Sequence, residues 1–183
     1  MKNKIVFQTS RLTAVFIDEL NQDHIIDLYN RKENIEFIEG INAELDIKLG
    51  LECYASYQGI GSYLIFENSS NKFIGIAGIQ KQEPMIDGSF SISDCDIEFL
   101  IVTHAEFNGR GYASEFCSAF FEKLFTLFPT LLIPARVDKN NAACIKLLTK
   151  FGFRDEGEVD YHKQGNKFAL LKVDFDSWQK SKL

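Results

Sequence analysis

The chain has 183 residues, of which 45% are hydrophobic and 17 are phenylalanine, which is enough for one well-cored domain and short for two. Its formal net charge of -6 argues against broad binding to a nucleic-acid backbone, which needs a basic face. We therefore expect a single domain over residues 1–183 that binds no nucleic acid.

Signals for secretion, membrane insertion and metal binding are lacking in the sequence. Residues 1–4 are polar, the next apolar run has only strand length, and no run approaches the ~20 residues that a membrane helix needs. The cysteines form no Cys-x-x-Cys pair, and no histidine follows them at the spacing of metal ligands. We expect a cytoplasmic protein with reduced thiols, no metal and no membrane contact.

In chain order, the hydrophobic periodicity predicts a strand, two helices, a hairpin, two strand–helix units and a final hairpin. The first strand is expected over 5–19, the first helix begins near residue 23, and the second helix covers 42–57. The first hairpin covers 62–67 and 72–80. The two strand–helix units cover 96–102 with 111–128 and 131–137 with 141–151, and the last hairpin covers 154–161 and 167–175. Such interleaving predicts an α+β (mixed α/β) domain with one mixed sheet and helices on both faces.

The first strand–helix unit, Asp96 to Phe128, organises the rest of the chain. Its strand and helix are joined by the turn Asn108-Gly109-Arg110-Gly111. A glycine-rich turn at a helix start leaves backbone N–H groups free, where the helix dipole also favours an anion, so a phosphate or pyrophosphate is the natural ligand. The alternative is that the two glycines only permit a tight turn.

A second segment joins this loop in a known pattern. Val137, Asn141 and Cys144 are followed by a helix and by Gly152-Phe153, and Asn140 or Asn141 caps that helix. With both segments, the chain resembles the GNAT superfamily of acetyl-CoA-dependent N-acetyltransferases. The family loop Gln/Arg-x-x-Gly-x-Gly/Ala is matched by residues 108–113 except at the first position, and Val-x-x-x-Asn-x-x-Ser is matched with cysteine in place of serine.

Further motifs place the chain closest to the ribosomal-protein-alanine and -serine N-acetyltransferase branch. Thr9-Ser10-Arg11-Leu12 matches its opening Thr-x-Arg-Leu strand, and Ile74-Gly75-Ile76-Ala77-Gly78 matches its Ile-Gly-x-x-Gly strand. Glu98 stands where that branch has a strand glutamate, and Gly111-Tyr112-Ala113-Ser114-Glu115 resembles its Gly-Tyr-Ala-Thr-Glu. The resemblance covers nearly the whole chain.

The resemblance implies a fold, a cosubstrate and a set of contacts. The fold is a central, mostly antiparallel sheet of about seven strands, splayed in the middle to admit the cofactor's pantetheine arm. Pro134 fits this, because proline in a strand indicates a bulge or an edge. Acetyl-CoA is the cosubstrate, and the protein is a monomer or homodimer. The two predicted helices near the N-terminus wall the acceptor side of the site, so substrate contacts are expected in the connection 33–41. The implied cofactor contacts are Ile101, Val102, Thr103, Asn108, Gly109, Arg110, Gly111, Tyr112, Ala113, Asn141 and Cys144.

Acetyl transfer to an amine needs a base for the ammonium proton and a donor for the developing oxyanion, and the departing thiolate can need an acid. Glu98 is the candidate base, because on a strand it shares a face with Asp96 while Phe99 and Ile101 face the core. The alternative is that Glu98 is a solvated or ion-paired acid. Tyr161 is a candidate proton donor.

Other roles stay open at this level. Asn141 contacts the cofactor arm or is a plain N-cap, and Cys144 is a packed thiol or a substitute for the family serine. The expected activity is direct acetyl transfer to a primary amine, either a protein N-terminus, such as that of a ribosomal protein, or a small molecule. The alternative is a catalytically weak, GNAT-like acyl-CoA-binding or regulatory module.

Overall fold

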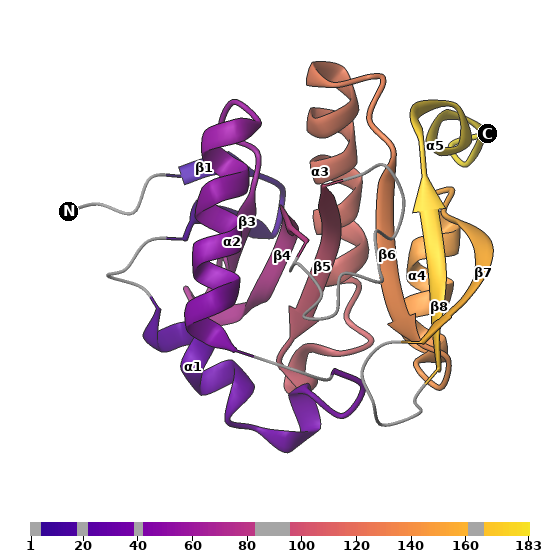
Figure 1. Cartoon of the computed structure of the whole chain (residues 1–183). Coiled ribbons are helices and arrows are strands. Elements are labelled where there is room, and N and C mark those ends of the chain that lie inside the picture. Colours follow the sequence, from indigo (N-terminus) through magenta and orange to yellow (C-terminus); the bar gives the residue numbers. More distant parts are fainter. Residues whose placement is uncertain (1–4, 18–21, 39–41, 83–95, 161–166) are drawn as a thin grey trace.

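The computed structural model describes residues 5–17, 22–38, 42–82, 96–160 and 167–183. Within these ranges the chain forms eight strands and five α-helices, with short 3-10 turns at η1 (Lys32–Asn34) and η2 (Ala105–Phe107) (Figure 1). The strands are β1 (Ile5–Gln8), β2 (Leu12–Phe16), β3 (Ser62–Glu67), β4 (Phe73–Lys81), β5 (Ile97–Thr103), β6 (Ile133–Asp138), β7 (Arg154–Asp160) and β8 (Lys167–Val173). The helices are α1 (Asp23–Tyr29), α2 (Ala43–Ser56), α3 (Tyr112–Leu127), α4 (Ala142–Lys150) and α5 (Phe175–Lys180).

The strands form two antiparallel sheets that divide between β5 and β6. Strands β1 to β5 pair in sequence order, and the second sheet has the order β6-β8-β7. Strands β5 and β6 lie side by side in Figure 1 but belong to different sheets. β6, which contains Pro134, is therefore an edge strand, as the sequence predicts. The mixed fold with a splayed antiparallel sheet is confirmed, with eight described strands where about seven were expected.

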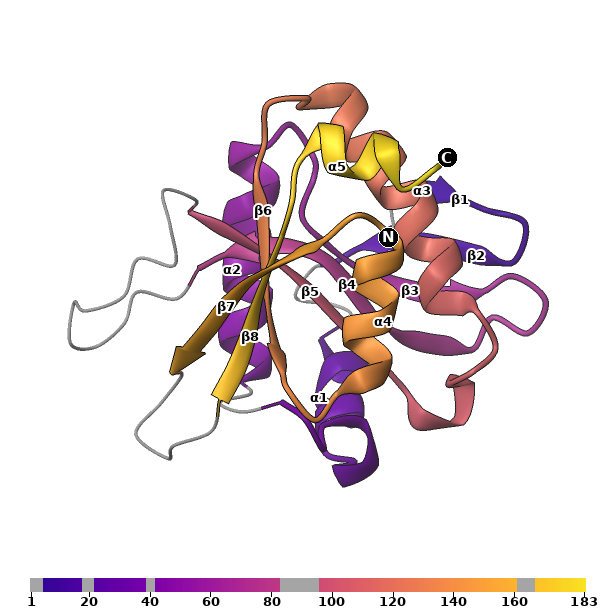
Figure 2. The ribbon, with the colours of Figure 1, turned by 90° about the vertical axis from the view of Figure 1, so that its right-hand side faces the viewer.

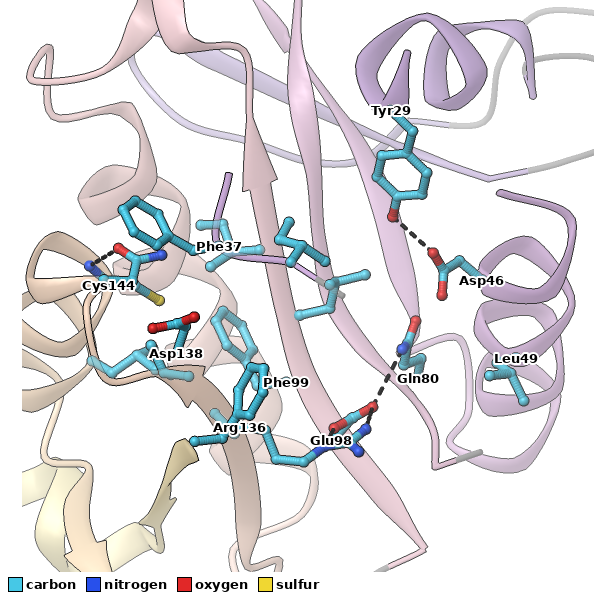
Figure 3. Close-up of a pocket in the computed structure, with 18 of the residues that line it drawn as sticks. Tyr29, Phe37, Asp46, Leu49, Gln80, Glu98, Phe99, Arg136, Asp138 and Cys144 are labelled. Atoms are coloured by element: carbon cyan, nitrogen blue, oxygen red, sulfur yellow. Dashed lines mark hydrogen bonds and ion pairs between the residues drawn. The ribbon is translucent and has the colours of Figure 1, made fainter. Parts of the chain in front are cut away.

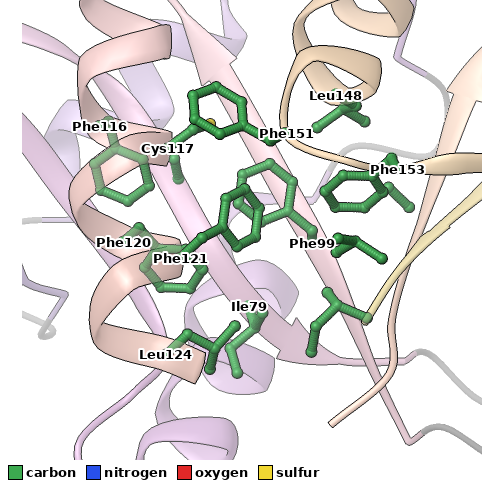
Figure 4. Packing of buried hydrophobic residues seen from close by; sticks show 14 of the residues in the cluster. Ile79, Phe99, Phe116, Cys117, Phe120, Phe121, Leu124, Leu148, Phe151 and Phe153 are labelled. Carbon is green, nitrogen blue, oxygen red and sulfur yellow. The ribbon is translucent and has the colours of Figure 1, made fainter. Parts of the chain in front are cut away.

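Helices cover both faces of the strands. Figure 2 shows α2 on one side and α3 with α4 on the opposite side. Under α1 and α2, Ile25 and Ile47 pack with Val102 of β5. The opposite face buries a larger cluster that includes Phe99 and the apolar stripe of α3 (Figure 4). Residues of β5 therefore alternate between two cores, which fixes the direction in which each side chain of this strand points.

The Ile-Gly-x-x-Gly motif has a packing reason on β4. A Cβ atom on Gly75 would lie 2.1 Å from the carbonyl oxygen of Val102, and one on Gly78 would lie 2.1 Å from that of Gly61. A side chain at either position would collide with backbone of a neighbouring strand. The two glycines therefore let β4 closely approach β5 at Val102 and the start of β3 at Gly61.

Two segments form different elements from those expected. The strand expected over 5–19 is a hairpin of β1 and β2, closed by a turn in which the Leu12 N–H donates to Thr9 Oγ1 at 2.9 Å. The last strand ends at Val173 instead of 175, because Asp174 and Ser177 form a capping box that starts α5. Residues 83–95 lie outside the described residues, and so do residues 161–166, which join the two strands of the last expected hairpin. Among the helices formed by the described residues, none has the length and apolar content needed to cross a bilayer.

Candidate active site

The predicted phosphate loop follows the end of β5. Gly111 is the N-cap of α3 at φ 80° and makes no side-chain cap, and Gly109 has φ 75° with open space where a Cβ would be. Both glycines are in the left-handed region that other residues rarely adopt. The first turn of the 16-residue helix α3 thus presents backbone N–H groups and a positive dipole end without a competing side-chain acceptor, which is a suitable cradle for a pyrophosphate.

The N-terminal Thr-x-Arg motif holds this loop in place through Glu115. Glu115 Oε1 accepts hydrogen bonds from Thr9 Oγ1 at 2.5 Å and from the Arg11 N–H at 3.0 Å, and Oε2 lies 2.6 Å from Arg11 Nε. Arg11 Nη1 also donates to the Arg110 carbonyl at 2.9 Å. Burial would raise the pKa of Glu115, but these hydrogen bonds outweigh it and lower the pKa to about 2. Two motifs that the sequence places far apart are therefore one structural unit.

Tyr112 and Asn108 complete the scaffold of the loop. Tyr112 is 7% exposed, its hydroxyl donates to Glu67, and the Arg11 guanidinium lies 4.6 Å from its ring centroid. The hydrogen bond to Glu67 raises the pKa of Tyr112. At the end of β5, Thr103 Oγ1 donates to Asn108 Oδ1 at 3.1 Å. These contacts fix where α3 begins relative to the edge of β5.

A cavity of about 150 Å³ lies where β5 and β6 separate (Figure 3). It is bounded by strands on one side and by α1, α2 and α4 on the others. Its polar lining side chains come from α1, α2, β4, β5, β6 and the N-cap of α4. They are Tyr29, Asp46, Gln80, Glu98, Arg136, Asp138 and Asn141.

Glu98 points into this cavity and contacts Arg136 across the gap between the sheets. Arg136 Nε donates to Glu98 Oε2 at 2.8 Å, and Arg136 Nη2 donates to Oε1 at 2.6 Å. The side chains are 10% and 13% exposed, so this bidentate pair is largely shielded from solvent. The sequence leaves open that Glu98 is an ion-paired acid, and in the structure Glu98 does form such a pair with Arg136.

A second acid faces the same cavity from α2. The Tyr29 hydroxyl donates to Asp46 Oδ2 at 2.8 Å. Burial and the charge of Asp46 raise the pKa of Tyr29 well above its ordinary value, so its hydroxyl keeps the proton that it donates. On the far side, Asp138 Oδ1 accepts from the Asn140 N–H at 2.7 Å. Three carboxylates and one guanidinium line the described part of the cavity, a balance that favours a cationic guest.

Helix α4 supplies the remaining wall. Asn141 is its N-cap, with Oδ1 accepting from the Cys144 N–H at 3.0 Å, and both residues line the cavity. Burial raises the pKa of the Cys144 thiol to about 11, so the sulfur is a protonated, weak donor near neutral pH. The capping role considered for Asn141 is confirmed, and its amide nitrogen is a further polar group at the same cavity wall.

The structure brings the predicted residues together in two groups. Residues 108–113 form the loop and first turn of α3 beyond the C-terminal end of β5. Glu98, Ile101, Asn141 and Cys144 line the cavity, which extends along β5 over residues 98–101. Val102 points away into the core beneath α1 and α2. Tyr161 lies outside the described residues.

Sequence reasoning missed Arg136, Asp46, Tyr29 and Gln80. Arg136 has a readable signal, because it is the single charge in the otherwise apolar run 131–137. Gln80 likewise ends the apolar run of β4. Within the connection 33–41, where substrate contacts are expected, the described residues Phe37 and Ile38 line the cavity.

A family model for the acetyltransferase (GNAT) domain matches residues 13–154. The chain belongs to the GNAT acetyltransferase family. The enzyme class expected from the sequence, an N-acetyltransferase, is confirmed by this membership. The match includes the phosphate loop and the cavity residues described above.

Solved structures share the fold at low sequence identity. An acetyltransferase from Agrobacterium tumefaciens has a TM-score of 0.71 at 15% identity, over 91% of this chain and 92% of that chain. RimL, a ribosomal-protein alpha-N-acetyltransferase solved with coenzyme A, has a TM-score of 0.72 at 15% identity, over 95% of this chain and 99% of that chain. Spermidine N-acetyltransferase from Vibrio cholerae, solved with CoA and spermine, has a TM-score of 0.65 at 16% identity, over 93% of this chain and 99% of that chain. At these identities the similarity establishes the fold and leaves the acceptor of this chain open.

Proposed function

We propose that the protein transfers the acetyl group of acetyl-CoA directly to a primary amine bound in the cavity between β5 and β6. The observation that supports this most strongly is that the loop at residues 108–113 and the cavity residues lie along the same strand, β5. The predicted phosphate loop lies beyond the C-terminal end of β5, and the acid-lined cavity lies along residues 98–101 of the same strand. One extended cosubstrate lying along β5 would reach both.

The cosubstrate would lie along the open edge of β5. Among the described strands, β5 pairs with β4, and its other edge faces the gap to β6. Backbone groups of residues 101–103 would pair with the pantetheine arm, and the N–H groups of residues 109–113 would bind the pyrophosphate. Arg110 would add a positive charge beside the phosphates. The thioester would then lie near Cys144 and Asn141, at the wall of the cavity.

The acceptor would enter from the side of α1 and α2. A protonated amine is attracted by Asp46, Glu98 and Asp138, which outnumber the guanidinium of Arg136. The comparisons support either kind of acceptor, since RimL acts on a ribosomal protein and the Vibrio cholerae enzyme on spermidine. We propose a primary amine, whether a protein N-terminus or a small molecule.

Glu98 would take the proton of the ammonium. Its carboxylate accepts two hydrogen bonds from Arg136 and a long one, 3.4 Å, from Gln80 Nε2. Because a carboxylate has about four acceptor positions, one remains for the amine or for a water that relays the proton. Arg136 would hold the carboxylate in a fixed orientation. Tyr161 remains the proposed donor to the departing thiolate. No covalent enzyme intermediate is required, because the amine attacks the thioester itself.

The test is thiol release from acetyl-CoA with a panel of primary amines, using the wild type and Glu98→Gln. We expect turnover with at least one amine, and a loss of about a hundredfold or more in kcat for Glu98→Gln with unchanged acetyl-CoA affinity. An unfolding curve checks that the variant is folded. Binding of acetyl-CoA without turnover on any amine would favour the alternative, a binding or regulatory module, over the enzyme.

A further inference from the structure

The side-chain oxygen of Gln80 is a buried acceptor that no described residue satisfies. Gln80 is 6% exposed and lies opposite Glu98 in the β4–β5 ladder, with Nε2 3.4 Å from Glu98 Oε1. Reversing the amide would place its oxygen against a carboxylate oxygen, so the contact with Glu98 fixes the orientation. Since buried polar atoms are rarely left without partners, Oε1 is suited to a donor that comes from a ligand.

The surroundings of this oxygen favour a positively charged donor. Figure 3 shows Gln80 between Glu98 and Asp46, with its oxygen directed to the Asp46 side and its nitrogen to the Glu98 side. Tyr29 donates to Asp46 and thereby orients that carboxylate. An ammonium beside Asp46 would gain both a hydrogen-bond acceptor and a compensating charge, whereas a neutral donor would gain the first alone.

The position of Gln80 separates this donor from the reacting amine. Gln80 is on β4, one strand further from β6 than Glu98, and neighbouring strands are about 4.8 Å apart. Cys144 and Asn141, at the proposed thioester wall, lie across the gap on α4. A group bound at Gln80 is therefore a second group of the same acceptor, several bonds away from the nitrogen that is acetylated.

We propose that Gln80 and Asp46 form a subsite for a second cationic nitrogen, so that short aliphatic diamines are preferred acceptors. This rests on the proposed function, because it requires the acceptor to enter the cavity between β5 and β6. The cavity of about 150 Å³ is of a size known to hold a benzene-sized molecule, and putrescine has as many non-hydrogen atoms as benzene. The ammonium donates to Gln80 Oε1, and its charge is balanced by Asp46.

The experiment compares putrescine with n-butylamine, which has the same chain and one ammonium fewer. Titration calorimetry with CoA present measures binding without turnover, after a separate titration has shown that CoA itself binds. The variants are Gln80→Met, which removes the acceptor at nearly constant volume, and Asp46→Asn, which removes the charge and keeps an oxygen for Tyr29. Gln179→Met, an exposed position on α5, is the matched control.

We expect the wild type and Gln179→Met to bind putrescine about tenfold or more tightly than butylamine, the size of one hydrogen bond to a charged group. Gln80→Met should lose this preference and keep the affinity for butylamine. Asp46→Asn should also lose the preference, and should weaken butylamine by a smaller factor, because Asp46 attracts any protonated amine to the cavity. The subsite would be overturned if Gln80→Met preferred putrescine over butylamine as strongly as the wild type does, or if the wild type showed no such preference. Either result would mean that Gln80 Oε1 contacts only water. Failure of every amine to bind overturns it as well. Absence of CoA binding in the first titration would instead contradict the proposed function.

Discussion

Glu98 on β5 and Arg136 on β6 are joined by two hydrogen bonds at the place where the two sheets separate. The pair is the polar link between the strands on either side of the proposed pantetheine cleft. It therefore has both a structural and a chemical consequence, because the same carboxylate holds the sheets together and faces the acceptor.

Removing Arg136 alone should be costly for folding. Arg136→Met leaves the Glu98 carboxylate shielded and without its cation, and we expect the free energy of unfolding to fall by about 3 kcal/mol. The double variant Glu98→Met with Arg136→Met should recover most of that loss. Urea unfolding measures both. Lys139→Met is the control, because the Lys139–Glu158 pair is over 40% exposed on each side and should contribute less than about 1 kcal/mol. Equal losses in the two single variants would show that the Glu98–Arg136 pair is energetically a surface contact.

Glu115 should make the free energy of unfolding decrease as the pH falls. Its pKa is lowered from 4.5 to about 2 in the folded chain, so its ionised form favours folding above about pH 4.5, and this contribution is lost as the pH falls toward 2. We expect Glu115→Gln to cost about 1–3 kcal/mol near neutral pH, with a difference that shrinks on acidification. Urea unfolding from neutral pH to about pH 3 follows it. Glu122→Gln, at an exposed carboxylate of the same helix, should show no comparable dependence. A constant difference across that range would exclude the lowered pKa as its cause.

The cap of α5 offers a local stability test. Asp174 Oδ1 accepts from the Ser177 N–H at 2.8 Å and starts the helix that buries Trp178 against the core. Asp174→Ala should lower the unfolding free energy by about 1–2 kcal/mol. Asp176→Ala, at an exposed position two residues later in the first turn of α5, should cost only a few tenths of a kcal/mol. Thermal unfolding compares the two, and equal effects would contradict the capping role.

Cys144 tests where the cosubstrate lies. Because burial raises the pKa of its thiol to about 11, alkylation by iodoacetamide should be slow near neutral pH and should increase well beyond the pH at which an ordinary thiol is ionised. Bound acetyl-CoA should slow it further, since Cys144 lines the proposed thioester wall. Peptide mapping by mass spectrometry resolves this cysteine from the others. Unchanged labelling in the presence of saturating acetyl-CoA would place the thioester elsewhere.

The sequence predicts the elements whose signals are local. The glycine turn before α3 and the asparagine cap of α4 are written in neighbouring residues, and both lie within one residue of their predicted positions. Helix α5 also had a local signal, the Asp174-x-x-Ser177 cap, but the apolar run before it was extended over it as a strand. Boundaries of this kind depend on which of two local signals dominates.

The polar partners in the cavity could not be predicted in the same way. Glu98 and Arg136 are 38 positions apart, and Asp46 and Tyr29 are 17 apart on different helices. Which charge meets which depends on how the sheets and helices pack, and that is not encoded in spacing along one element. The contact between Thr9 and Glu115 is similar, because both motifs were recognised but not their contact. A lone charge in an apolar strand, such as Arg136, is the signal that would have improved the prediction.

The central claim is that residues 109–113 bind the pyrophosphate of acetyl-CoA, and Gly109 gives the most direct test. Gly109 has φ 75° and open space at its Cβ position, and aspartate and asparagine are the residues that best tolerate this conformation. Gly109→Asp and Gly109→Asn have the same shape and backbone strain and differ in one negative charge. Titration calorimetry with acetyl-CoA should show binding to the wild type and to Gly109→Asn, and a loss of about tenfold or more in Gly109→Asp. Equal affinity of the two variants, or no binding to the wild type, would contradict the account.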